Sequence, residues 1–239
     1  MKNQGQTEDQ PARFNTARRL ATNPLASIER RCLLWLAARL PRHVNSDHLT
    51  LLALAAMAFT GLSYAAARFT KIGLLLAVAG LVLNWFGDSL DGTLARVRRQ
   101  ERPRYGFYVD HIVDCVGVGF LVAGLGSSGY MSPIVAASFL VAYFMLSIEI
   151  YLATYCLAVF RLSFWGVGPT ELRILLAIGT LALVSDPKVH VFGGHYRLFD
   201  VGGLVAVASI ALILVTSISR NVQLLYRAEP LRQAISPGA

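Results

Sequence analysis

Two adjoining stretches decide the fold of this chain, 84-NWFGDSLDGTLARVRRQ-100 and 105-YGFYVDHIVDCVG-117. Each joins aspartates to a long apolar run. An apolar helix needs about 20 residues to cross the roughly 30 Å of hydrocarbon in a bilayer. Since the runs around these aspartates reach that length, the sequence predicts that the acids belong to membrane-spanning helices.

The composition of the whole chain also indicates a membrane protein. Of its 239 residues, 55% are hydrophobic and 15% are charged, whereas soluble domains carry about 25% charged residues. The net charge of +8 would suit nucleic acid. However, the basic residues lie between apolar runs and form no single polar surface, which argues against nucleic-acid binding. The three cysteines are scattered in apolar surroundings and indicate neither a disulfide framework nor a zinc site.

The apolar segments predict an all-α polytopic membrane protein with six transmembrane helices. An even number of spans leaves both termini on one side. That side is expected to be the cytoplasm, because 18 of the 22 lysines and arginines fall in the segments assigned to it. We therefore expect a multi-pass protein of a bacterial inner membrane, with both termini cytoplasmic. The predicted spans are residues 48–67, 72–95, 108–127, 133–160, 171–185 and 201–220.

The chain divides into three parts around this membrane region. Residues 1–45 are a polar N-terminal segment, residues 46–225 the six-helix transmembrane domain, and residues 226–239 a cytoplasmic tail. In the first part, Asn23 can cap a helix that starts at Pro24 and has apolar residues at helical spacing. We expect this amphipathic helix to lie in the membrane interface, among lipid headgroups. The alternative is that it packs on the protein's own cytoplasmic face.

Four aspartates at membrane depth require compensation, because one ionised aspartate near the bilayer centre costs about 2.5 to 3.5 kcal/mol. Asp88 and Asp91 are three residues apart and Asp110 and Asp114 four, so each pair projects from one face of its helix. Two such faces brought together need cations or retained protons between them. Carboxylates suit Mg²⁺ or Mn²⁺ better than zinc. The pattern predicts a cation-filled cleft that opens to the cytosol; ordinary loop-end aspartates are the alternative.

The same residues resemble a family signature. The pattern D-x-x-D-G-x-x-A-R, a nine-residue spacer and G-x-x-x-D-x-x-x-D is similar to that of the CDP-alcohol phosphotransferases. The resemblance implies a homodimeric membrane enzyme that moves a substituted phosphate group from a CDP-linked donor to an acceptor alcohol and releases CMP. CDP-diacylglycerol is the favoured donor, and a CDP-choline or CDP-ethanolamine donor with a diacylglycerol-like acceptor is the alternative. The matching positions are Asp88, Asp91, Gly92, Ala95, Arg96, Gly106, Asp110 and Asp114.

The resemblance also implies roles for these positions. Asp88, Asp91 and Asp110 would hold metal, as two Mg²⁺ or Mn²⁺ ions. Asp114 would act as the general base and would also touch the second ion. Nucleotide and phosphate binding would involve Gly92, Ala95, Arg96 and Gly106.

Other polar residues near the spans are candidates for the acceptor pocket, because polar groups in lipid should face the interior and find partners. The stretch GPTE at residues 168–171 is similar to the choline and ethanolamine branch of the family. One departure concerns the first span, where many members have P-N-x-x-T. This chain has Ser46 and Asp47 in place of the proline and asparagine and keeps Thr50. The candidate acceptor residues are Asn84, Glu149, Thr170, Glu171 and Arg173.

Two other classes of protein match part of this pattern. Membrane prenyltransferases also use aspartate-rich metal sites, but they typically have more spans and lack the G-x-x-A-R continuation. A cation carrier would move ions through carboxylates near the bilayer centre. The aspartates of this chain are instead expected toward the cytoplasmic ends of their helices.

Overall fold

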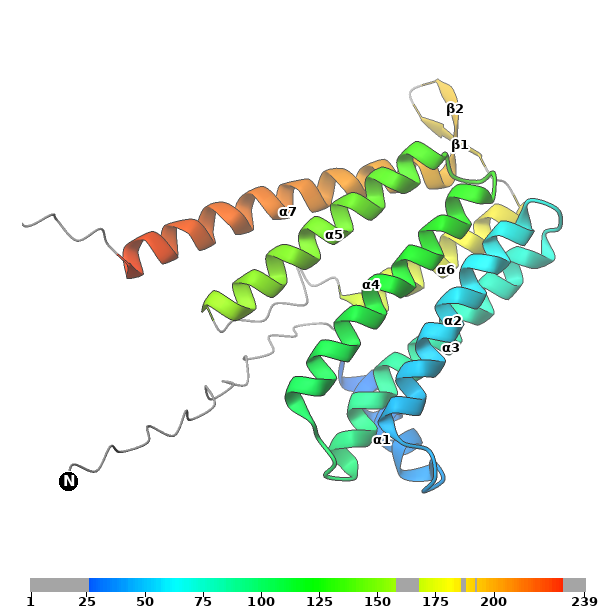
Figure 1. Ribbon diagram of the computed structural model, residues 1–239. Coiled ribbons are helices and arrows are strands. Elements are labelled where there is room, and N and C mark those ends of the chain that lie inside the picture. Colours follow the sequence, from blue (N-terminus) through cyan, green and yellow to red (C-terminus); the bar gives the residue numbers. More distant parts are fainter. Residues whose placement is uncertain (1–25, 158–167, 186–187, 192, 230–239) are drawn as a thin grey trace, which may run out of the picture.

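The computed structural model describes residues 26–157, 168–185, 188–191 and 193–229 (Figure 1). The predicted cap Asn23 and the first helical residue Pro24 lie outside these ranges, as does the end of the predicted span 133–160. The elements are α1 (Ala26–Arg39), α2 (Ser46–Ala67), α3 (Ile72–Val97), α4 (Pro103–Ser127), α5 (Pro133–Leu157), α6 (Pro169–Ser185), β1 (Lys188–Val191), β2 (Gly194–Arg197) and α7 (Leu198–Ala228).

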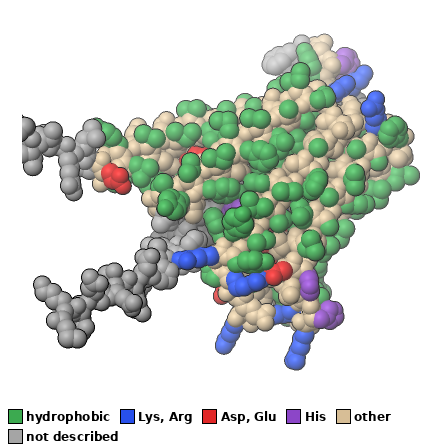
Figure 2. All heavy atoms as spheres, in the orientation of Figure 1, with side chains coloured by type: hydrophobic (Ala, Val, Ile, Leu, Met, Phe, Trp, Pro, Cys, Tyr) green, Lys and Arg blue, Asp and Glu red, His purple; other side chains and the backbone are tan. Residues whose placement is uncertain are grey.

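Five of the described helices are long and apolar enough to cross a membrane, namely α2, α3, α4, α5 and α7. They confirm an all-α membrane protein and five of the six predicted spans. The remaining segment, predicted at 171–185, is helical as α6. With 17 residues it is about 25 Å long, which is shorter than the roughly 30 Å of hydrocarbon. Six full spans are therefore not confirmed. Figure 2 shows hydrophobic side chains over the helices, with lysines and arginines gathered at the ends.

The N-terminal helix α1 packs on the protein. Leu33 and Ala37 of α1 are buried together with Leu49 of α2 and with Leu90 and Leu94 of α3. This packing agrees with the alternative in which the helix lies on the protein's own face. Contact of this helix with the membrane interface stays a prediction. Large hydrophobic side chains on α1 are nevertheless exposed, namely Ile28, Leu34 and Trp35.

Glycines allow α2 to pack closely on both α3 and α4. A Cβ atom at Gly124 of α4 would lie 2.0 Å from the carbonyl oxygen of Gly61 in α2. On the other side, a Cβ atom at Gly80 of α3 would lie 2.2 Å from Thr60 Oγ1. Such small-residue contacts are the usual way in which membrane helices approach each other. Consequently α2 holds the two helices that carry the predicted acids.

The helices α5 and α7 form a second pair, which runs away from α4 beyond the turn that joins α4 to α5 (Figure 1). Glu149 of α5 accepts hydrogen bonds from Ser217 Oγ (2.7 Å) and Asn221 Nδ2 (2.7 Å) of α7. An acidic residue inside an apolar helix needs such partners. These bonds therefore link the two helices across their shared face.

A short β-hairpin precedes α7 and is not predicted by the sequence analysis. β1 pairs antiparallel with β2, and His190 lies opposite His195. Gly193 has a φ of +80°, a backbone conformation that glycine adopts without steric cost. Strands of four residues are too short for an alternating pattern to stand out in the sequence.

Candidate active site

The structure brings the four predicted aspartates into one region. Asp88 and Asp91 lie near the end of α3, and Asp110 and Asp114 lie near the start of α4. Asp114 interacts electrostatically with the other three, and Asp91 interacts with Asp88 and Asp110. The acids of α3 and those of α4 therefore lie within electrostatic reach of one another.

A metal centre is not confirmed. Within the described part of the chain, no group of three or more histidine, cysteine, aspartate or glutamate side chains is arranged to hold a metal ion. The chemistry of the donor set still fits such an ion, because carboxylates are the hard oxygen ligands that Mg²⁺ and Mn²⁺ prefer. The four acids also lie within electrostatic reach of one another, which favours a bound cation.

Asp91 is held by the start of α2. Its side chain is 4% exposed. Thr50 Oγ1 donates to Asp91 Oδ2 (2.7 Å), and the Gly92 N–H donates to Oδ1 (2.5 Å). Ser46 Oγ also donates to the Asp91 carbonyl oxygen (3.1 Å), and Asn45 caps α2. Thr50, the threonine that this chain shares with the P-N-x-x-T pattern, therefore supports a site carboxylate.

Replacing this threonine by its isostere should weaken the fold. Thr50→Val leaves the buried Asp91 carboxylate without its side-chain donor, and we expect the free energy of unfolding to fall by about 1 to 3 kcal/mol. Thermal unfolding of the purified protein in one detergent, followed by intrinsic fluorescence, measures the change. Thr216→Val is the matched control, because Thr216 is exposed and bonds only carbonyls of its own helix. Equal unfolding midpoints for the two variants would contradict this role of Thr50.

The side chain of Arg173 in α6 contacts the acidic region at Asp88 of α3. Its Nη2 atom lies 2.5 Å from Asp88 Oδ2, and its Nε donates to Asn84 Oδ1 (2.8 Å). Asn84 is buried and donates in turn to the Ala53 carbonyl oxygen (3.1 Å). Charge-assisted bonds of this kind are strong and directional. One of the predicted acceptor residues, Arg173, thus contacts the predicted metal ligand Asp88, and a second, Asn84, contacts Arg173.

The other acceptor candidates have different partners. Thr170 Oγ1 donates to Glu29 Oε1 (2.9 Å), and Glu171 Oε2 accepts from the Gly168 N–H (3.0 Å) at the start of α6. The second contact is a capping interaction at the start of α6. Glu149 binds α7, as described above. In the structure, Glu149 therefore contacts α7, whereas Asn84 and Arg173 contact each other.

Gly92 and Gly106 leave open space. A Cβ atom at Gly106 would meet nothing within 4 Å, and one at Gly92 would meet only Arg96 Nη1, at 3.7 Å. By contrast, a Cβ atom at Gly87 would lie 2.7 Å from the Leu49 carbonyl oxygen. Helix packing thus requires glycine at position 87 but not at the other two. The room beside the acids is available to a substrate, as the nucleotide-pocket hypothesis requires.

The end of α3 carries the two remaining signature residues. Arg96 is exposed, and its Nη2 donates to Thr93 Oγ1 (3.1 Å). Ala95 is half-buried in the same turn. Arg98 has a structural role, because its guanidinium donates to the carbonyl oxygens of Leu40 and Pro41, at 3.1 and 2.9 Å. It thereby fastens the connection between α1 and α2 to the end of α3.

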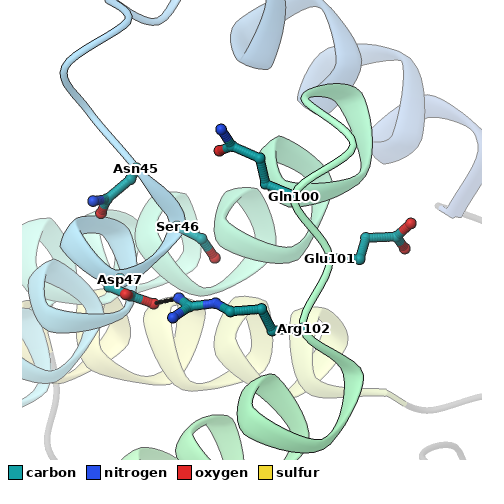
Figure 3. Close-up of a pocket in the computed structure, with 6 residues that line it drawn as sticks. All are labelled: Asn45, Ser46, Asp47, Gln100, Glu101 and Arg102. Atoms are coloured by element: carbon teal, nitrogen blue, oxygen red, sulfur yellow. Dashed lines mark hydrogen bonds and ion pairs between the residues drawn. The ribbon is translucent and has the colours of Figure 1, made fainter.

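A cavity of about 420 Å³ opens where the start of α2 meets the connection between α3 and α4 (Figure 3). Arg102 Nη2 and Asp47 Oδ1 form an ion pair of 2.5 Å there, and this hydrogen bond raises the pKa of the Arg102 guanidinium. Asp47 occupies the position of the asparagine in the family pattern. In this chain the residue at that position is therefore paired with Arg102. Ser46 also lines the cavity and connects it to Asp91. The lining residues are Asn45, Ser46, Asp47, Gln100, Glu101 and Arg102.

A second cavity, of about 380 Å³, lies among α1, α3 and α6. Its lining includes the apolar side chains of Leu81, Val82 and Ile174. Arg173, which pairs with Asp88, also borders it. This apolar groove therefore reaches a side chain of the acidic site.

Comparison with known proteins supports the resemblance on which these expectations rest. A family model described as CDP-alcohol phosphatidyltransferase matches residues 44–219. The match includes all four aspartates and Arg173, and it leaves α1 outside. Comparison with curated proteins finds no match.

Proposed function

The chain belongs to the CDP-alcohol phosphatidyltransferase family, and we propose that it moves a phosphatidyl group from CDP-diacylglycerol to a small polar alcohol and releases CMP. Family membership makes the protein a membrane phosphotransferase that takes a phosphate-linked group from a CDP-alcohol to an acceptor. It thereby sets aside the cation carrier and the prenyltransferase. The identity of the donor and the class of acceptor are our proposal.

One observation carries the proposal: the acidic region and the apolar groove meet at Arg173. Its guanidinium pairs with Asp88 and borders the groove. A lipid whose phosphate lies near this cation could place its acyl chains against the apolar lining. Such a substrate matches both the charge and the apolar surface found there.

Asp114 is the proposed general base. It lies on α4, within electrostatic reach of the other three aspartates and of Arg173. As the acceptor oxygen bonds to the β-phosphorus, the carboxylate takes the hydroxyl proton. The bond from that phosphorus to the CMP oxygen breaks, and CMP leaves with the α-phosphate. This assignment is supported by the signature position of Asp114.

Asp88, Asp91 and Asp110 are the proposed metal ligands. A bound Mg²⁺ or Mn²⁺ would supply positive charge to the phosphate oxygens during transfer. The chain's own residues prepare the carboxylates for this role, because Thr50 orients Asp91 and Arg173 orients Asp88. The space at Gly92 and Gly106 supports binding of the nucleotide beside these acids.

A second candidate function is favoured by one observation. Pro169, Thr170 and Glu171 form the first turn of α6, and with Gly168 they resemble the choline and ethanolamine branch. In that case the donor would be CDP-choline or CDP-ethanolamine, and the groove would bind a diacylglycerol-like acceptor.

Orientation and assembly are also proposals. The concentration of arginines in the connection between α3 and α4 supports a cytoplasmic location for the site and for both termini. A homodimer is implied by the resemblance and stays a prediction, as does the division of the chain into residues 1–45, 46–225 and 226–239.

The donor can be identified with purified protein in lipid nanodiscs. Radiolabelled CDP-diacylglycerol or CDP-choline is supplied with a panel of polar alcohols or with diacylglycerol, and labelled lipid and CMP are scored. We expect labelled lipid from CDP-diacylglycerol and an alcohol. Product from CDP-choline and diacylglycerol would favour the second candidate. Absence of CMP release from both donors, with Mg²⁺ and Mn²⁺ present, would overturn the proposed function.

A further inference from the structure

The side chain of Glu29 connects α1 to two helices of the candidate site. Its Oε1 atom accepts hydrogen bonds from Trp85 Nε1 (2.8 Å) and Ser89 Oγ (3.4 Å) of α3. The same atom accepts from Thr170 Oγ1 (2.9 Å) of α6. Glu29 precedes the region matched by the family model. The contact is therefore a feature of this chain that the signature does not contain.

These bonds lie beside the Asp88–Arg173 ion pair. On α3, Trp85 directly follows Asn84 and Ser89 directly follows Asp88, so the partners of Glu29 and those of Arg173 occupy adjacent rows of the helix. On α6, Thr170 and Arg173 are three residues apart and share one face. Glu29 therefore binds the same turns of α3 and α6 that carry the ion pair.

We propose that Glu29 is a positioning residue, which holds the start of α6 against α3 so that Arg173 reaches Asp88. The rest of α6 has other attachments, because Thr180 shares a hydrogen bond with Tyr64 (2.6 Å) and the Val184 carbonyl oxygen accepts from Lys71 Nζ (2.8 Å). Glu29 supplies the corresponding attachment at the start of the helix. The proposal rests on the proposed function, since Arg173 matters for turnover only if Asp88 belongs to the active site.

Four variants separate this role from a general effect on folding. Glu29→Ala removes the acceptor, and we expect kcat for CMP release to fall at least about tenfold, because a shift of about 1 Å in a positioning group can cost about 100-fold. Glu29→Gln keeps an acceptor oxygen and should retain most of the activity. Thr170→Val removes only the bond to α6 and should lower kcat as Glu29→Ala does. Arg30→Ala, an exposed neighbour on α1, is the control and should turn over normally.

Combining substitutions tests whether Glu29 acts through Arg173. In the Arg173→Lys enzyme the guanidinium fork is lost, so adding Glu29→Ala should lower kcat much less than it does in the wild type. A residue that only stabilises the fold would give the same loss in both backgrounds. That result, or full activity of Glu29→Ala in an active wild-type preparation, would overturn the positioning role.

A fluorescence measurement examines the contact without any substrate. In a Trp35→Phe, Trp165→Phe background, Trp85 is the remaining tryptophan. Glu29→Ala should shift its emission, because the indole N–H loses its acceptor, whereas Glu29→Gln and Arg30→Ala should change it little. An unchanged emission would overturn the proposal. If the wild type released no CMP while the emission shifted, the proposed function would fail and the Glu29 contact would stand as an anchor of α1 only.

Discussion

Asp114→Asn is expected to release CMP about 10² to 10⁴ times more slowly than the wild type, which is the usual contribution of a general base. An amide has nearly the shape of a carboxylate but cannot take the acceptor's proton. Asp114 also lies within reach of three acids, so removing its charge should not impair folding. Initial rates of CMP release at saturating donor and acceptor, measured on purified protein, give the ratio directly.

Asp200→Asn is the matched control for this substitution. Asp200 lies in the first turn of α7, and its Oδ1 accepts the Ser132 N–H (2.6 Å). Asparagine keeps that acceptor oxygen, so turnover should remain near normal. Nucleotide binding by both variants, measured by calorimetry with CMP, establishes that the pocket is intact. Near-normal turnover of Asp114→Asn would remove Asp114 from the role of general base.

Removal of divalent cations should abolish turnover. Asp88, Asp91, Asp110 and Asp114 concentrate negative charge beside a site that must accept a pyrophosphate, and this arrangement is unfavourable without cations. We expect treatment with EDTA followed by desalting to reduce CMP release to background. Addition of Mg²⁺ or Mn²⁺ should restore it.

Binding of Mn²⁺ provides a readout that does not depend on activity. Electron paramagnetic resonance of free Mn²⁺, titrated with metal-free protein, should show fewer bound ions for Asp91→Asn than for the wild type. Asp200→Asn should bind as the wild type does. Full turnover in the presence of EDTA, or equal Mn²⁺ binding by all three proteins, would discard the metal site.

Local sequence was sufficient to predict the helices and the grouping of acids. A run of about 20 apolar residues forms a membrane helix wherever it lies in the chain. Aspartates three or four residues apart share a helix face by helix geometry alone. For these reasons α2, α3, α4, α5 and α7 were predictable, as was the meeting of Asp88 and Asp91 with Asp110 and Asp114.

The length of α6 and the supports of the acids were less predictable. The helix α6, Pro169–Ser185, has 17 residues and is shorter than the five candidate spans, although its composition resembles theirs. Thr50 and Asp91 are 41 residues apart, and Glu29 and Thr170 are 141 apart. In the sequence, Glu29 is one acidic residue in a helix that contains both polar and apolar side chains. No local sequence pattern indicates which distant side chains will donate hydrogen bonds to it.

The chemistry proposed for this protein therefore comes from short stretches of chain, while the arrangement of the residues that would serve it follows from packing. The spacing of four aspartates along two apolar helices was enough to predict an acidic site, and the resemblance of the surrounding residues to a known signature indicated the family. The close contacts of glycines on α2, α3 and α4 decided how those helices lie. Only the tertiary structure shows that Arg173 pairs with Asp88 and that Thr50 donates to Asp91. It also shows that Glu29 accepts hydrogen bonds from both α3 and α6. A hydrogen bond between distant helices depends on the position of both backbones, and each backbone position depends on the whole bundle.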